Sequence, residues 1–252
     1  MAAAPVMPTP TPEAAPLSEG ARLVNVCIAP SKTFTDLRRS ASWWAPFVLL
    51  SVMSLAFVYT VDQKIGFRKV AENQIQASPK AAQRIEQLPA DQRNQTMQRQ
   101  AVFFRNFSYA YPAVILVWNV VIAAILFATF KFAASADVKF KTSLAIVMYA
   151  SLPLLVKTLL ATISVAAGAS ADSFTFQNPV ATNPGYFLTP ADSPFLYSLA
   201  TAIDIFMIWT LIVTAIGFTC VSKVKRSTAL AIVFGWYLVF ALGGAGFGAM
   251  FS

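Results

Sequence analysis

Five long apolar blocks, separated by more polar connections, constrain this chain more than any other feature of its sequence. Each block holds roughly the twenty residues that an α-helix needs to cross a hydrocarbon core about 30 Å thick. Helices buried in a soluble bundle would need amphipathic sequence to cover them, and too little of it remains. The blocks therefore predict an all-α membrane protein, a bundle of five transmembrane helices over about 43–61, 110–130, 143–167, 196–220 and 228–250.

The composition agrees with a membrane protein. Of the 252 residues, 57% are hydrophobic and only 12% are charged, whereas a soluble domain typically carries about 25% charged residues. The formal net charge is +8. These charges are scattered over several connections, which fits solvated loops better than the clustered basic face that binds nucleic acid. We expect the lipid bilayer as a partner, and no nucleic acid.

The residues that most enzymes use are missing. The chain has no His and two widely separated cysteines, Cys27 and Cys220. Without His it lacks the commonest general base and metal ligand. The cysteines have no CxxC partner that would indicate a zinc site or a redox pair. The sequence therefore predicts a protein that is not an enzyme, with no catalytic residue, metal or cofactor.

Three segments outside the apolar blocks have distinct compositions. Residues 1–20 are rich in Pro and Ala and predict a disordered tail. Residues 62–109 are rich in Gln and Ala and predict a helical extramembrane insertion, broken near Pro79 and Pro89. The third segment, 21–42, precedes the membrane domain, which we place at 43–252.

The 21–42 segment predicts an amphipathic lead-in that lies along the lipid headgroups. A brief helix after Pro30 would carry Phe34 and Leu37 on one face, and Arg38 and Arg39 elsewhere. We expect the two apolar side chains to insert at the membrane surface and the two arginines to attract anionic lipid.

Lys and Arg in the short connections predict the orientation. The 131–142 and 222–227 connections each carry three basic residues, and the 168–195 connection carries none. Basic connections stay in the cytoplasm, so the N-terminus is expected inside and the C-terminus outside. The 62–109 segment then lies outside despite its eight basic residues, because long connections follow the rule weakly. We expect a multi-pass protein of the cell membrane.

Three polar residues lie deep inside the predicted helices. They are Lys157, Asp204 and Asn119, at depths of roughly 15, 12 and 13 Å from the outer ends of their helices. A charge at the centre of a membrane costs about 2.5–3.5 kcal/mol unless it is paired. Lys157 and Asp204 could form a buried ion pair that fixes the order of the helices. They could also form a proton or ion site, or never meet.

Two further features suggest contacts outside the membrane core or between helices. Gly244 and Gly248 form a Gly-xxx-Gly pair in the last helix, a pattern typical of close helix packing. The 168–195 connection is rich in turn-forming and aromatic residues. It could be an ordered cap over the outer surface or an ordinary loop with interfacial aromatics.

Two short motifs resemble a known family. The lead-in reads Ala29-Pro30-Ser31-Lys32-Thr33-Phe34, followed by Ser42-Trp43-Trp44-Ala45-Pro46, and the third helix contains Tyr149-Ala150-Ser151-Leu152-Pro153. With five spans and a cytoplasmic N-terminus, they make residues 25–250 similar to the Yip family of Ypt/Rab-interacting membrane proteins, in a bacterial-type version. Eukaryotic members carry an acidic residue and a Gly where this chain has Ser42 and Ala45, which weakens the case for Rab-type GTPase binding.

The resemblance implies a non-enzymatic protein that organises membranes, a scaffold or adaptor for a membrane-protein partner or a second copy of itself. The alternative is a small transporter or channel component that uses Lys157, Asp204 and Asn119. It lacks the support of an inverted repeat, because five spans do not divide evenly. A water-filled cavity reaching Lys157 would favour the alternative, and a dry, closed pair would favour the scaffold.

Overall fold

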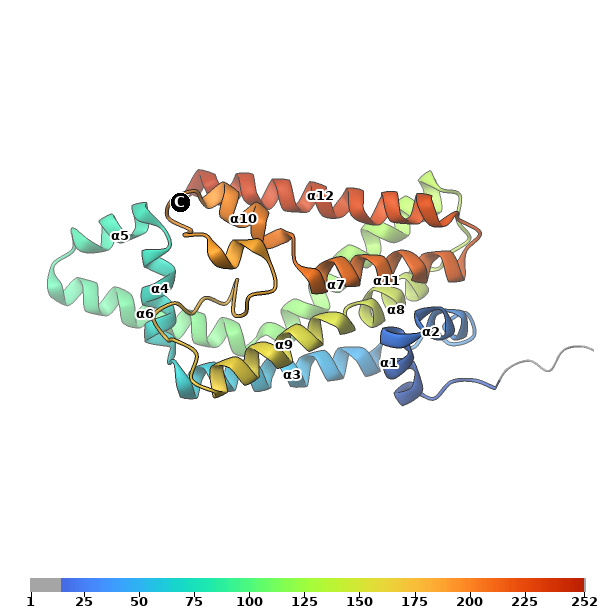
Figure 1. Ribbon diagram of the computed structural model, residues 1–252, viewed down its shortest axis with the longest axis horizontal. Helices are drawn as coiled ribbons and strands as arrows, with labels where there is room; N and C mark the ends of the chain where they lie inside the picture. The colour runs from blue at the N-terminus through green and yellow to red at the C-terminus, as the bar shows by residue number, and fades with distance from the viewer. Residues whose placement is uncertain (1–14, 252) are drawn as a thin grey trace, which may run out of the picture.

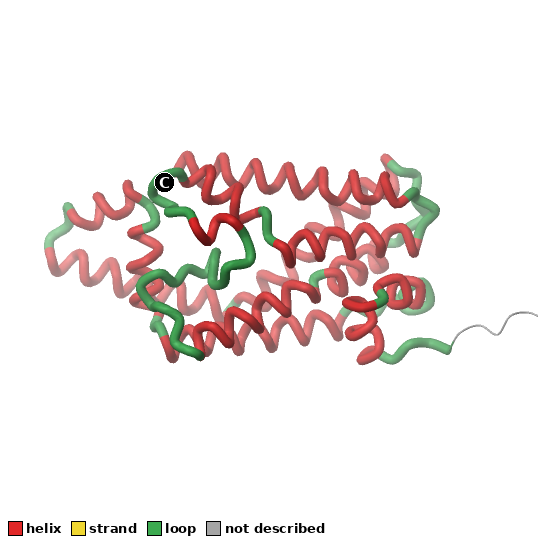
Figure 2. The backbone as a smooth tube through the Cα atoms, in the orientation of Figure 1, coloured by secondary structure: helices red, strands yellow, loops and turns green. Residues whose placement is uncertain are grey.

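The computed structural model describes residues 15–251, which are helical, with connecting loops and no strand in that range (Figures 1 and 2). Most of the predicted tail, residues 1–14, lies outside the described residues. The helices are α1 (Glu19–Ile28), α2 (Pro30–Asp36), α3 (Trp44–Lys64), α4 (Phe67–Gln76), α5 (Pro79–Glu86), α6 (Ala90–Tyr109), α7 (Tyr111–Ala128), η1 (Thr129–Ala133), α8 (Phe140–Ala150), α9 (Leu152–Ala166), η2 (Pro184–Phe187), α10 (Pro194–Ala202), α11 (Ile205–Val221) and α12 (Arg226–Phe251).

The described residues contain four helices that are long and apolar enough to cross a membrane, or five if one bent pair counts as a single span. The four are α3, α7 with η1, α8 with α9, and α12, and the bent pair is α10 with α11. The prediction of an all-α bundle of transmembrane helices is confirmed. The fourth predicted span is the bent one, with an angle of 51° between its halves.

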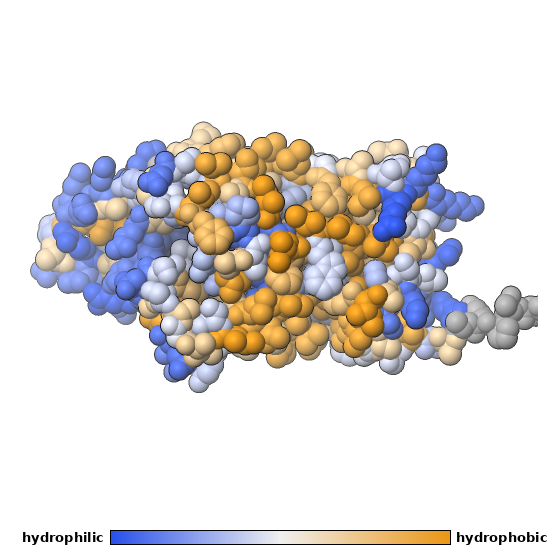
Figure 3. Space-filling model, in the orientation of Figure 1, coloured by the Kyte–Doolittle hydropathy of each residue, from blue (hydrophilic) through white to orange (hydrophobic). Residues whose placement is uncertain are grey.

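The molecule is elongated, and its polar parts gather at its two ends. Helices α1 and α2 lie at one end, beside the start of α12, while α4, α5, α6 and the C-terminus lie at the other (Figure 1). Hydrophobic residues form a broad band between the polar ends on the face shown in Figure 3. This band is what a helical bundle presents to lipid. The chain therefore starts and finishes at opposite ends of the bundle, and which end faces the cytoplasm stays a prediction.

The 62–109 segment forms three helices that project beyond the bundle (Figure 1). Ser78 caps α5, accepting a hydrogen bond from the backbone of Ala81, and Pro79 is its first residue. Pro89 precedes α6. Proline suits the first turn of a helix, where its missing N–H has no partner to lose. Helix α6 then meets α7 at Ala110 and so leads directly into the membrane domain.

The main core lies where the lead-in meets the second, third and fourth spans. Phe130 and Phe218 stack with centroids 3.9 Å apart, and both are buried. Tyr149 and Phe34 are buried beside them in the same cluster. Gly217 makes this packing feasible, because a Cβ there would lie 2.5 Å from Ile146 and 3.2 Å from Phe34. The core thus couples α2 to the membrane helices.

Candidate functional site

Lys157 and Asp204 meet inside the bundle. The Lys157 Nζ atom lies 2.8 Å from Asp204 Oδ2, and the side chain of Asp204 is 5% exposed. Lys157 is on α9 and Asp204 is the residue just before α11, so the pair joins the third and fourth spans. The sequence left open whether the two residues meet, and the structure places them in direct contact. Each charge has the partner it needs in a medium of low dielectric constant.

Asp204 is also the point at which the fourth span breaks. Its Oδ1 atom accepts hydrogen bonds from the backbone N–H groups of Phe206 and Met207, at 3.0 and 3.2 Å. Asp is a favoured N-cap because its carboxylate satisfies amides that have no partner in the first turn, and its charge suits the positive end of the helix. The sequence shows a lone acid in an apolar block; the structure shows a helix that starts there.

The outer connection reaches down to the same carboxylate. Thr182 donates a hydrogen bond to Asp204 Oδ2, and Asn183 Nδ2 approaches the same oxygen at 3.4 Å. Asn183 also donates to Asn178, which donates to the hydroxyls of Tyr197 and Thr201 on α10. The Asp204 carboxylate therefore contacts donors from the third span, from the fourth span and from the connection between them.

This connection is an ordered cap over part of its length. Phe174 is buried, and its ring lies 5.3 Å from that of Phe176, which stacks on Phe67 of α4. Phe187 in contrast is 78% exposed. Lys69 of α4 lies 2.6 Å from Asp172. Their hydrogen bond lowers the pKa of the Asp172 carboxyl and raises the pKa of the Lys69 amine. The cap therefore binds α4 to the bundle.

Asn119 is not part of the ion pair. Its Oδ1 atom accepts a hydrogen bond of 3.1 Å from Ser151, and its Nδ2 atom donates to the carbonyl of Ile115. The expected cluster of three is thus wrong in one member. Equal depth placed Asn119 beside the charges, but depth does not determine which face of α7 carries the side chain. The face it lies on points instead to the break between α8 and α9.

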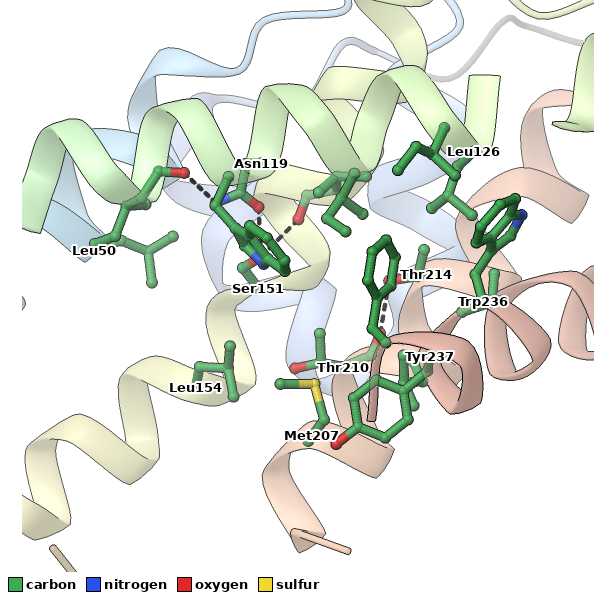
Figure 4. Close-up of a pocket in the computed structure, with 18 of the residues that line it drawn as sticks. Leu50, Asn119, Leu126, Ser151, Leu154, Met207, Thr210, Thr214, Trp236 and Tyr237 are labelled. Atoms are coloured by element: carbon green, nitrogen blue, oxygen red, sulfur yellow. Dashed lines mark hydrogen bonds between the residues drawn. The ribbon is translucent and has the colours of Figure 1, made fainter. Parts of the chain in front are cut away.

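A cavity of about 440 Å³ lies beside Asn119. Side chains from α3, α7, α8, α9, α11 and α12 surround it, and Figure 4 shows the labelled ones converging on the space between these helices. Asn119 and Ser151 lie at its wall, whereas Lys157 and Asp204 are not among the residues that line it. This cavity and the buried charges are therefore separate features.

The lead-in differs from the prediction. Phe34 is fully buried and Leu37 is 1% exposed, packed in the protein core rather than at the membrane surface. The apolar side chains that α1 exposes are Val24 and Ile28. An amphipathic helix needs an apolar surface to cover one face, and the sequence does not say whether that surface is lipid or protein. Arg38 and Arg39 are exposed, and their contact with lipid headgroups stays a prediction.

A second charged cluster holds the lead-in in place, and little in the sequence predicts it. Arg22 Nε lies 2.7 Å from Asp36 Oδ2, and both side chains are less than a tenth exposed. Arg22 also contacts Glu19, which accepts a hydrogen bond from the Tyr149 hydroxyl. Burial alone would lower the pKa of Arg22, but the hydrogen bond and charge of Asp36 outweigh it and raise that pKa. The i, i+3 spacing of Glu19 and Arg22 was the one available signal.

The predicted glycine pair makes no tight contact within the chain. A Cβ on Gly244 would meet nothing within 4 Å, and one on Gly248 would lie 3.8 Å from Ser198. The close approaches occur at Gly217 and at Gly185, where a Cβ would overlap Thr201. Packing between copies of the chain through Gly244 stays a prediction.

These features define a class of protein: a multi-pass helical membrane protein whose polar side chains form structural contacts. Residues 24–248 match the Yip1 domain family, and the chain belongs to that family. Neither a curated protein nor a solved structure matches the chain. Among the described residues, no group of three or more His, Cys, Asp or Glu is placed to hold a metal ion.

The structure gives a physical role to the motif that first suggested the family. Tyr149 fastens the lead-in through Glu19, Ser151 hydrogen-bonds to Asn119, and Pro153 lies in the first turn of α9. The motif therefore joins the lead-in, the second span and the broken third span at one place.

Proposed function

We propose that this protein is a membrane-organising scaffold or adaptor of the cell membrane, in the bacterial inner membrane, that carries out no catalytic step. It would act by holding a membrane-protein partner, or a second copy of itself, at a fixed position relative to the bilayer. The two motifs and the family membership support a role that depends on binding rather than on chemistry.

One observation carries this proposal: the intramembrane charges are used within the protein. Asp204 receives hydrogen bonds or charge from five groups, and Lys157 is one of them. A carboxylate with that many donors is stable without a substrate ion. The pair lies where a span is broken, so its evident effect is to fix the path of the chain.

The extramembrane helices supply a surface for a partner. Lys80 and Arg84 on α5 and Arg99 on α6 are exposed, and the cap holds this module against the bundle. A basic, solvated surface on a rigid support suits an acidic region of another protein, since charge complementarity guides association.

The test is chemical cross-linking in native membranes, followed by mass spectrometry of the partners. We expect the double variant Lys80→Glu, Arg84→Glu to lose partners that the unaltered chain captures. The matched control is Lys32→Glu, which changes an exposed Lys at the opposite end of the molecule. Loss of the same partners from the control, or retention of all partners by the double variant, would count against an adaptor surface on these helices.

A small transporter or channel component is the second candidate, and the cavity beside Asn119 is the observation that favours it. Proteoliposome flux assays with Lys157→Met and Asn119→Leu separate the two proposals. A transporter should lose flux in both variants while its fold is kept. A scaffold should show no flux to lose, and Lys157→Met should change stability instead.

A further inference from the structure

The cavity between the spans is large enough for part of a lipid. Its volume is about 440 Å³, whereas an apolar protein cavity of about 150 Å³ already holds benzene. Its walls include Leu50 of α3, Leu154 of α9 and Leu211 of α11. Empty space of this size is unfavourable, because atoms around it lack dispersion contacts on one side. An occupant would restore those contacts.

The cavity runs from an exposed rim to a buried floor. On α7, Tyr111 and Trp118 line it and are about half exposed, whereas Asn119 and Leu126 line it and are buried. Across the rim, Trp118 contacts Phe240 of α12 through their rings, 5.8 Å apart. Because α7 and α12 are spans, the surface at this rim is one that faces acyl chains in a bilayer.

Most of the buried polar groups along the walls are already hydrogen-bonded within the protein. These bonds are donated by Ser54 to Ser51, Asn119 to Ile115, Ser151 to Asn119, Thr158 to Leu154, Thr214 to Thr210, Tyr237 to Ala202 and Trp236 to Thr129. The hydroxyl of Thr210 is the one buried polar group of the described lining without a partner. A water molecule needs two to four polar partners, and an ion needs more. The walls therefore favour an apolar occupant.

We propose that this cavity binds the acyl chain of a membrane lipid. The chain enters from the bilayer beside Trp118 and lies against Leu50, Leu154 and Leu211, while its headgroup stays outside the bundle. This proposal is independent of the partner-binding role above. It assigns a ligand to a cavity that neither the ion pair nor the lead-in lines. The bound acyl chain would complete the packing between the helices.

The experiment uses the full chain in nanodiscs of phosphatidylethanolamine and phosphatidylglycerol, with a trace of phosphatidylcholine that carries a diazirine in the middle of one acyl chain. After irradiation, mass spectrometry locates the adducts. We expect adducts on Leu154 and Leu211 in addition to those on Val117 and Leu238, which are exposed on the outer faces of α7 and α12. Adducts confined to the outer faces would overturn the proposal.

Filling the cavity tests the same idea. Leu154→Trp should lower the yield of the interior adduct at Leu211 several-fold and leave the yield of the outer adduct at Val117 unchanged. The control Leu238→Trp, on the exposed face, should change neither yield. Size-exclusion chromatography and circular dichroism establish that each variant folds. If Leu154→Trp does not fold, Val233→Phe fills the cavity from α12 and replaces it. An interior adduct that survives filling would overturn the proposal.

A pair of threonines shows whether the occupant is a plain hydrocarbon chain. Thr210 and Thr214 both line the cavity, one helical turn apart, and the Thr214 hydroxyl is bonded to the Thr210 carbonyl. A hydrocarbon offers nothing to the free Thr210 hydroxyl, so Thr210→Val should keep or increase the interior labelling, as should the control Thr214→Val. Loss of labelling in Thr210→Val alone would show that the occupant has a polar group at this depth and would overturn the acyl-chain assignment.

Discussion

The Arg22–Asp36 and Lys157–Asp204 ion pairs are both buried, but they join different kinds of element. Arg22–Asp36 connects two short helices, α1 and α2, at one end of the molecule. Lys157–Asp204 lies within the bundle, at the break between α10 and α11. The first pair fastens a segment onto a core that other helices complete. The second is part of the path of a membrane span.

The two pairs also differ in how well their charges are sealed from the surroundings. The side chain of Arg22 is 5% exposed and that of Lys157 is 20% exposed. Lys157 is thus the less enclosed of the two cations, but it lies inside a candidate membrane span, where an unpaired charge is costly. Burial alone therefore does not predict which pair is costlier to break. The loss of stability depends on which segments of the chain each pair joins.

The largest expected effect is all-or-none, and it concerns the two polar ends of the molecule. In a background without Cys27 and Cys220, single cysteines at Gln87 and Ser227 should respond oppositely to a membrane-impermeant thiol reagent in intact cells. Both positions are exposed, so accessibility of the thiol does not limit labelling. Equal labelling of the two cysteines would contradict the prediction that α4–α6 and the α11–α12 connection lie on opposite sides of the membrane.

The next effect should follow Asp204→Leu, which removes the ion pair and the N-cap of α11 together. We expect a loss of about 3–5 kcal/mol in the free energy of unfolding, because Lys157 is left without its partner. Thermal unfolding in detergent measures it. Asp204→Asn is the control that keeps the cap. The double variant Asp204→Leu, Lys157→Met should recover part of the loss; strictly additive single effects would mean that the two residues do not interact.

Arg22→Met should have a smaller and more local effect. We expect the docking of α1 to weaken by about 1–3 kcal/mol, since Asp36 loses its charged donor. Hydrogen exchange of the α1 amides should rise while exchange in α9 stays the same. Arg68→Met breaks the exposed Arg68–Glu72 pair and should change neither. Global unfolding in the Arg22 variant, with no separate opening of α1, would contradict the contrast between the two pairs.

The smallest effect is expected at the contact that joins α2 to the fourth span. Gly217→Ala places a Cβ against Ile146 and Phe34. The steric cost of overpacking, about 1–3 kcal/mol, exceeds the stability of about 0.5–1 kcal/mol that Ala adds in a helix interior, so the variant should be less stable. Gly244→Ala meets open space and should be neutral or stabilising. If Gly244→Ala instead reduces oligomer content in cross-linking, the Gly-xxx-Gly pair packs between copies of the chain.

The sequence could predict the spans and one ion pair because each rests on an uncommon local feature: a long apolar block, or a charged residue inside one. A charge in an apolar block, such as Lys157 or Asp204, has few ways to be satisfied, so its partner can be inferred. Arg22 and Asp36 lie in a polar segment, where charges are ordinary and no partner is indicated. Phe34 shows a second limit: its helical face predicts burial, but protein and lipid are equally apolar coverings.

The break at Asp204 has a consequence for how the protein is made. Helix α10 has nine residues, about 13 Å of helix, and α11 has 17, about 25 Å. Neither spans a core of about 30 Å alone, and the acid between them opposes insertion until it is paired. The fourth span should therefore leave the insertion machinery together with the third, as a hairpin in which Lys157 already neutralises Asp204. Biogenesis, rather than the finished bundle, is then the stage at which this pair is most needed.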